Sequence, residues 1–228
     1  MIDAMSLFRR RHHIPFLIVG HPRCGTTSAA TACQQMNIEV GSEEVLAHGI
    51  SSWMMAVDDR NNPFGDGILA RSRYNISWDW LILVVRDAKD AVPSVILENQ
   101  HSPSSYAFRR KHIRRQLNID LDQAGDPVSA AVLSIVCWIE IILKQNPAFS
   151  FRIEDEQQKF IDFLAGTKSI AGLAPGRQVS SARVNTGKQY DGIKHDKPLL
   201  PDSTWSDLEP AVRERLEWYC ERFGYDYP

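Results

Sequence analysis

A glycine-rich segment near the start of the chain, residues 20–27, reads GHPRCGTT and has the spacing of a loop that holds a phosphate group. It follows an apolar run at residues 16–20 and precedes a segment whose Ala and Gln content suits a helix. In this order of strand, loop and helix, successive backbone N–H groups and the helix N-terminus point at one anion. The structural context that phosphate binding requires is therefore present.

The cation of this loop differs from that of a loop that hydrolyses ATP or GTP. In such loops a lysine follows the second glycine and reaches the terminal phosphates, and the next hydroxyl residue holds magnesium. Thr26 occupies the lysine position here, and the cation lies within the loop at Arg23. A guanidinium there could contact both a bridging oxygen and a sulfuryl oxygen. The pattern points away from nucleoside triphosphates, and we expect no metal ion.

The loop resembles the phosphosulfate loop of the sulfotransferases that use 3′-phosphoadenosine 5′-phosphosulfate (PAPS). In that family the loop follows the first strand and reads Lys/Arg-x-Gly-Ser/Thr-Ser/Thr. The matching residues of this chain are Arg23, Cys24, Gly25, Thr26 and Thr27. The family's 3′-phosphate motif, an Arg at a strand end and a Ser eight residues later on the next helix, is matched by Arg86 and Ser94. Two motifs in the family's order carry the resemblance.

Weaker similarity extends to residues 151–155 and to the closing helix near residues 224–225. Arg183 and Lys188 resemble the family's basic loop that closes over the 3′-phosphate. The chain departs from the familiar cytosolic members in three ways: the loop has Arg instead of Lys, Cys instead of Ser, and no Trp directly after the threonines. The residue that stacks on adenine therefore stays unassigned.

The resemblance implies transfer of a sulfuryl group from PAPS to a hydroxyl or amine of a small-molecule or carbohydrate acceptor, with adenosine 3′,5′-bisphosphate as product. Thr26, Thr27 and the loop N–H groups would hold the 5′-phosphosulfate, and Arg86 and Ser94 would hold the 3′-phosphate. Arg23 would offset the charge that grows on the leaving oxygen. Cys24 is expected to fill space, because this chemistry needs no covalent enzyme intermediate.

A base is needed because the acceptor hydroxyl loses a proton as it attacks sulfur. The family's sugar-modifying members use a Glu downstream of the loop, and the corresponding stretch here offers Glu43, Glu44 and His48. We rank the two glutamates above the histidine. The preference is for Glu44, because a Glu-Val pair at this distance resembles the sugar sulfotransferases.

Two other functions fit parts of the pattern. A small-molecule or nucleoside kinase shares the strand, loop and helix but would need the missing loop lysine. A non-catalytic nucleotide-binding module would keep both phosphate sites without a base. Five basic residues follow one another along a predicted helix, where we expect a solvated face rather than a site for an anionic acceptor. They are Arg109, Arg110, Lys111, Arg114 and Arg115.

The remaining elements follow from apolar runs and capping residues. The first strand is predicted at residues 16–20 and its helix at 26–36; a second strand at 80–85 precedes a helix capped by Asp87 or Asp90, with Pro93 in its first turn. Further helices are predicted at 104–117, 128–145 and 155–164, a strand at 149–153, and long loops over 166–203. A capping box from Ser206 to Glu209 would open the last helix.

This alternation of strands and helices predicts an α/β fold with a central, mostly parallel sheet flanked by helices. With the loop, it suggests a P-loop nucleotide-binding, sulfotransferase-like architecture. Because no linker or internal repeat divides the 228 residues, we expect a single domain over residues 1–228. The sequence does not indicate an oligomeric state or the identity of the acceptor.

Bulk properties narrow the partners and the location. A net charge of −2 gives no general argument for nucleic acid or membrane binding. The basic residues at 9–13 are not followed by the apolar segment of a signal peptide, and the apolar run at 130–143 is shorter than a membrane span. Four cysteines without a CxxC pair suggest free thiols, neither a disulfide framework nor a zinc site, in the cytoplasm.

Overall fold

The central element of the computed structural model is a five-stranded sheet with the strand order β2-β3-β1-β4-β5. The structure describes residues 12–59, 63, 76–170, 172–173, 176, 189–190 and 193–228. All four neighbouring strand pairs of the sheet are parallel. The strands are β1 (His12–Val19), β2 (Val40–Ser42), β3 (Gly49–Ser51), β4 (Ile76–Val85) and β5 (Phe149–Arg152). The predicted α/β class with a mostly parallel sheet is confirmed.

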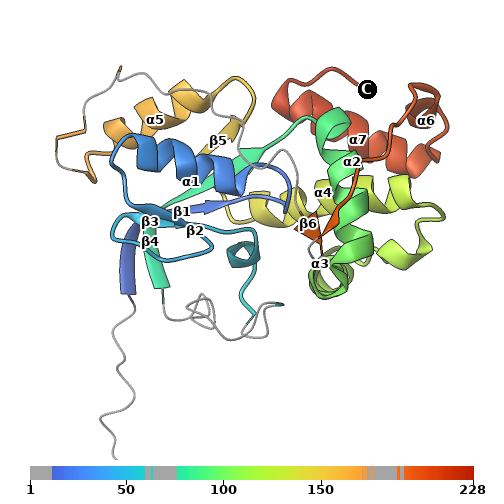
Figure 1. Ribbon diagram of the computed structural model, residues 1–228, viewed down its shortest axis with the longest axis horizontal. Coiled ribbons are helices and arrows are strands. Elements are labelled where there is room, and N and C mark those ends of the chain that lie inside the picture. Colours follow the sequence, from blue (N-terminus) through green and yellow to red (C-terminus); the bar gives the residue numbers. More distant parts are fainter. Residues whose placement is uncertain are drawn as a thin grey trace, which may run out of the picture.

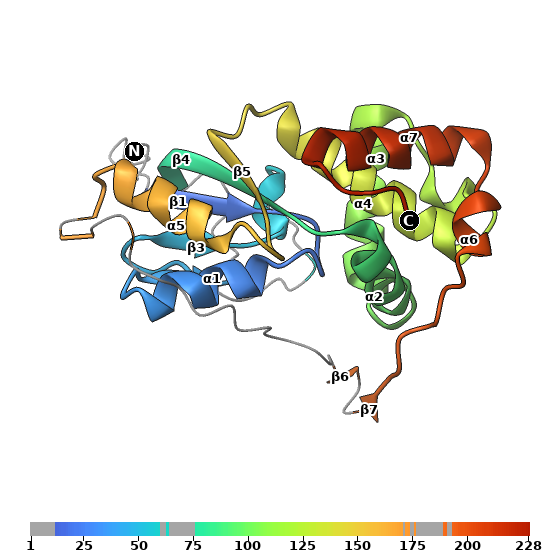
Figure 2. The ribbon, with the colours of Figure 1, turned by 90° about the horizontal axis from the view of Figure 1, so that it is seen from above.

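Helices lie on both faces of the sheet and beyond the ends of its strands (Figure 1). They are α1 (Thr26–Gln35), α2 (Ala88–His101), α3 (Pro103–Leu117), α4 (Pro127–Leu143), α5 (Gln157–Gly166), α6 (Ser203–Ser206) and α7 (Pro210–Phe223). Two short 3₁₀ helices, η2 (Met54–Ala56) and η5 (Leu121–Gln123), and a small antiparallel pair, β6 (Gln189–Tyr190) with β7 (Ile193–Lys194), complete the described elements. Figure 2 shows α2, α3, α4, α6 and α7 gathered on the side toward which the strands run.

Alternating residues of the central strands supply two separate hydrophobic clusters. In β1, Phe16 and Ile18 pack with α1 and α5, whereas Leu17 and Val19 pack with α4 and η2. This alternation is what a strand buried on both faces requires. Twelve of the seventeen residues of α4 are buried, so the apolar run over residues 130–143 belongs to a helix of the hydrophobic core. Within the part of the chain that the structure describes, no helix is both long enough and apolar enough to cross a bilayer.

The sequence did not predict β2 and β3, which are three residues each. Each contains a glycine, which lowers strand propensity, and the alternating pattern is too short to recognise. Gly49 is needed because a Cβ there would lie 2.2 Å from the carbonyl oxygen of Phe16 on β1. The candidate bases lie in the segment that connects these two strands, so the position of the strands determines which of those bases approaches the loop.

The predicted start of α7 was wrong, whereas for α2 the predicted cap is confirmed and only the predicted place of Pro93 was wrong. Ser206 ends α6, and its hydroxyl donates to the carbonyl of Ser203 at 2.8 Å instead of capping α7. Glu209 is the N-cap residue of α7 and makes no side-chain capping bond there. In α2, Asp87 is the cap and accepts from the N–H of Lys89 at 2.9 Å. The helix then begins at Ala88, so Pro93 lies inside it and not in its first turn.

Candidate functional site

The loop after β1 forms a turn at the carboxyl edge of the sheet. Arg23 and Gly25 adopt left-handed backbone conformations, with φ of 73° and 104°. Gly25 is the N-cap of α1, and a Cβ at that position would lie 2.7 Å from Cγ1 of Ile153. Because glycine has no side chain to cap the first turn of α1, the N–H groups there are available to an anion.

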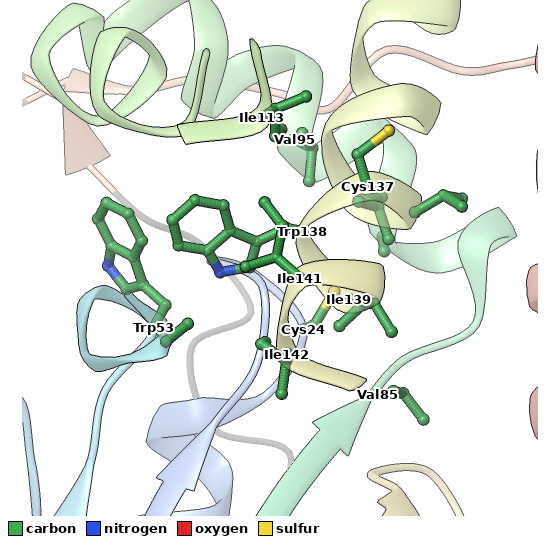
Figure 3. Packing of buried hydrophobic residues seen from close by; sticks show 14 of the residues in the cluster. Cys24, Trp53, Val85, Val95, Ile113, Cys137, Trp138, Ile139, Ile141 and Ile142 are labelled. Atoms are coloured by element: carbon green, nitrogen blue, oxygen red, sulfur yellow. The ribbon is translucent and has the colours of Figure 1, made fainter. Parts of the chain in front are cut away.

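The underside of the loop belongs to the hydrophobic core. Cys24 is fully buried, and Trp138 of α4 donates from Nε1 to the carbonyl of Gly20 at 3.1 Å. Figure 3 shows Cys24 and Trp53 around Trp138. Burial raises the pKa of the Cys24 thiol to about 12, although Arg86, Arg109 and Arg23 act in the opposite direction. The thiol stays protonated near neutral pH, and three guanidinium groups act on this one point of the loop.

The two predicted anion motifs meet in space. Nε of Arg23 donates to Oγ of Ser94 on α2 at 2.8 Å, across 71 positions of sequence. Arg86, which follows β4, donates from Nη1 to the carbonyl of Arg23 at 3.2 Å. Ser94 is buried, whereas the Arg86 side chain is 27% exposed. The loop and the strand end therefore form one continuous polar cluster.

The backbone and side chain of Arg86 are held by separate groups. The hydroxyl of Tyr219 in α7 donates to the Arg86 carbonyl at 2.6 Å and accepts from its N–H at 3.3 Å. The guanidinium lies 3.7 Å from Asp90 and 3.9 Å from Glu154. Both distances are near the upper limit for an ion pair, so these contacts of Arg86 are weak. An anion that binds to Arg86 would therefore displace little interaction energy.

Hydroxyl groups join the first turn of α1 to the ends of β2 and β3. Ser51 donates to the carbonyl of Thr26 at 2.7 Å, and Ser42 donates to the hydroxyl of Thr27 at 3.2 Å. These bonds bring the carboxyl ends of both short strands next to the loop. The residue after Ser42 is Glu43, the first of the candidate bases.

The structure separates the three candidate bases. Glu43 is half-buried, has a left-handed backbone (φ 58°), and accepts a hydrogen bond from the hydroxyl of Ser52. Non-glycine residues with this conformation are uncommon and collect at functional sites. Glu44 is exposed.

His48 lies at the opposite end of β3 from the loop. Its carbonyl accepts from the N–H of Phe16, four residues before the loop glycine, and its Nδ1 accepts from the N–H of Glu39 at 2.8 Å. Of the three candidate bases, only Glu43 directly follows a residue, Ser42, that is hydrogen-bonded to α1.

The prediction that the five basic residues of α3 form a solvated face is wrong for one of them. Arg109 is fully buried and makes hydrogen bonds in the interior of the protein. The other members lie at the surface, and three of them pair with acids: Arg110 with Asp122, Lys111 with Asp59, and Arg114 with Asp120. The prediction thus describes the outer face of α3 but is wrong for Arg109.

His21 is a loop residue that the sequence analysis did not single out. It is fully buried and contacts Arg109 and Ser134, which lies on α4. Burial, followed by the charge of Arg109, holds the pKa of His21 well below its usual value. A histidine inside the candidate phosphate loop was the available signal in the sequence, but its partners on α3 and α4 are distant in sequence.

Arg183 and Lys188 lie outside the residues that the structure describes. Among the residues that it does describe, no group of three or more His, Cys, Asp or Glu side chains could hold a metal ion. The four cysteines are free and buried.

No known family model, curated protein or solved structure matches the chain.

Proposed function

We propose that this protein is a sulfotransferase that moves a sulfuryl group from PAPS to a hydroxyl or amine of a small-molecule or carbohydrate acceptor. The observation that carries the proposal is the contact between Arg23 and Ser94, with Arg86 bonded to the Arg23 carbonyl. PAPS carries anionic groups on both the 3′ and the 5′ side of one ribose. A protein that binds it needs two adjacent anion sites, and the two motifs supply them side by side.

The residues present suit such a donor. The N–H groups at the start of α1, with the hydroxyls of Thr26 and Thr27, would hold the 5′-phosphosulfate. Arg86 and Ser94 would hold the 3′-phosphate, where a guanidinium can make two parallel hydrogen bonds. Thr26 stands where a nucleoside-triphosphate loop has lysine, which argues against ATP.

In this proposal Glu43 is the general base, instead of the Glu44 that the sequence favoured. Glu43 follows Ser42, whose hydroxyl bonds Thr27, and its carboxylate accepts from Ser52. Glu43 takes the acceptor's proton as the acceptor oxygen or nitrogen forms a bond to sulfur. The bond from sulfur to the phosphate oxygen breaks, and that oxygen keeps the electron pair. Arg23 offsets the resulting charge. The free, buried thiols agree with a cytoplasmic location, which is part of the proposal.

Ligand-dependent thermal stability tests the proposal. Adenosine 3′,5′-bisphosphate should raise the melting temperature far more than ATP with magnesium, because only the bisphosphate engages both anion sites. Adenosine 5′-monophosphate is the matched ligand, since it lacks only the 3′-phosphate, and it should stabilise much less. Stronger stabilisation by ATP would instead support the alternative function, a small-molecule or nucleoside kinase.

The bisphosphate experiment does not by itself separate an enzyme from a binding module. Incubation with labelled PAPS and pooled hydroxyl and amine acceptors makes that distinction, since an enzyme transfers label and a binding module does not. Bisphosphate binding without transfer to any acceptor class would favour the module.

A further inference from the structure

A buried arginine lies directly behind the candidate phosphate loop. Arg109 of α3 donates to Ser134 Oγ on α4 at 2.5 Å and to Asn99 Oδ1 on α2 at 2.9 Å. Its Nη1 also lies 3.1 Å from Nε2 of His21 in the loop. One guanidinium therefore joins three helices to the loop.

These contacts determine the tautomer of His21. A guanidinium carries donors and no acceptor, so Nε2 of His21 must accept from Arg109. The proton of the neutral ring then resides on Nδ1, which lies 2.6 Å from the carbonyl oxygen of Pro22. Nδ1 therefore donates to that carbonyl. Ser134 Oγ, 2.9 Å from Nε2, is a second donor to the same nitrogen.

The orientation of the Pro22 carbonyl determines the orientation of the next N–H group. In a trans peptide the C=O and the following N–H point in opposite directions. His21 is buried, so the Pro22 carbonyl points toward the protein interior. The N–H of Arg23 consequently points away from His21, which is the side of the loop where the proposed anion would bind. A carbonyl facing that side would repel the anion.

We propose that Arg109 is a positioning residue of the phosphate loop, which acts through His21 to keep the Pro22 carbonyl turned away from the bound anion. Arg109 also fixes the distance between the two anion motifs, because Asn99 lies on the same helix as Ser94. This role rests on the proposed function, since it concerns how the loop holds its anion. It does not place Arg109 in contact with the reacting atoms.

Substitution of Arg109 by Met tests the proposal, because methionine keeps similar length and removes every donor. We expect R109M to weaken adenosine 3′,5′-bisphosphate binding by at least about tenfold in titration calorimetry, as for loss of hydrogen bonds from a charged group. R110M is the matched control: Arg110 is the adjacent residue, partly exposed and paired with Asp122. Its affinity should stay within about twofold of the native value. Native affinity in folded R109M would overturn the proposal.

Two substitutions of His21 test whether Arg109 acts through the hydrogen bonds of His21 or only through packing. The side-chain amide of Asn can occupy the position of Nδ1, whereas that of Gln occupies the position of Nε2. H21N should keep the bond to Pro22 and bind the bisphosphate more tightly than H21Q. In the H21N background R109M should cost less affinity than it costs in the native protein, since the link to His21 is already broken and only the contacts with Ser134 and Asn99 remain to be lost. Full additivity of the two substitutions would show that Arg109 does not act through His21.

Amide hydrogen exchange of the ligand-free protein keeps this inference separate from the proposed function. The Cys24 N–H donates to the His21 carbonyl at 2.9 Å within the loop. In R109M that amide should exchange faster, while amides of the central strand β4 keep native rates. If the native protein fails to bind the bisphosphate, the proposed function fails, but this measurement still decides the role of Arg109. Unchanged exchange at Cys24 would overturn the proposed role of Arg109.

Should R109M not fold, the variant R109K replaces it, because one ammonium group cannot span the same three partners.

Discussion

The hydroxyl of Tyr219 bonds both backbone groups of Arg86, donating to its carbonyl at 2.6 Å and accepting from its N–H at 3.3 Å. The two residues are 133 positions apart. The last described helix therefore fixes the turn that carries Arg86, the candidate ligand of the 3′-phosphate. Tyr219 is fully buried, and burial raises the pKa of its hydroxyl well above the usual value. The hydroxyl is therefore a permanent donor.

Tyr219→Phe should lower both stability and affinity, because two backbone groups of Arg86 lose their partner. We expect a loss of about 1–3 kcal/mol in the free energy of unfolding, measured by urea denaturation. Bisphosphate affinity should fall several-fold. Tyr227→Phe is the matched control: it removes a hydroxyl that donates to the Trp205 carbonyl at 3.0 Å, away from Arg86. Equal effects of the two substitutions on affinity would contradict a role for Tyr219 in orienting Arg86.

Arg23→Ala should depress turnover more than it depresses bisphosphate affinity, because the guanidinium matters most as the leaving oxygen gains charge. One electrostatic contact of this kind supplies about two orders of magnitude in rate. Steady-state kinetics with PAPS and calorimetry with the bisphosphate measure the two quantities. Ser94→Ala removes the hydrogen-bond partner of Arg23 Nε and leaves the charge of Arg23 in place. It should therefore lower bisphosphate affinity more than turnover. If Arg23→Ala abolishes binding and leaves the turnover number unchanged, Arg23 is an anchor and not a catalytic group.

Glu43→Gln should nearly abolish transfer and leave bisphosphate binding intact, because the amide keeps the shape of the carboxylate and loses its basicity. Glu44→Gln is the control, since Glu44 is the exposed neighbour. It should retain near-normal rates. If both amide variants keep near-normal rates and His48→Ala is inactive, the base is the histidine.

His21 should make the protein sensitive to acid. Burial, followed by the charge of Arg109, holds the pKa of His21 in the folded protein well below its usual value of 6.5. Below that value the unfolded chain binds a proton that the folded chain does not. Stability from this group is therefore fully present above pH 6.5 and is lost as pH falls, by about 1.4 kcal/mol per pH unit. Urea denaturation from pH 8 down to about pH 5 should show this slope in the native protein relative to His21→Asn. Parallel curves would contradict the assignment.

Much of the fold follows from local pattern. The strand, loop and helix from β1 to α1, the apolar strand β4 and the buried helix α4 each have a long, unambiguous signal in the sequence. Short elements were not predictable. The strand β3 is stabilised by pairing with β1, and β2 by pairing with β3. Hydroxyl groups join both strands to α1, and neither kind of interaction can be recognised within three residues of sequence.

The candidate site was predictable where it depends on motifs and unpredictable where it depends on distant partners. Arg23, Arg86 and Ser94 were predicted as anion ligands, and the structure brings these three together. The burial of Arg109 could not be foreseen, since a basic helix normally turns its charges to water. Its hydrogen-bond partners come from α2, α4 and the loop, which meet only in the folded protein.

The contact between Trp138 and Gly20 has a consequence for the energetics of binding. Trp138 is fully buried on α4, and Cys24 of the loop lies in the same cluster, so the floor of the loop is held by the packing of the core. An anion bound as proposed would meet a loop whose floor is already folded. The entropic cost of ordering the loop would then not be subtracted from the affinity, so a few contacts at the site would suffice for binding.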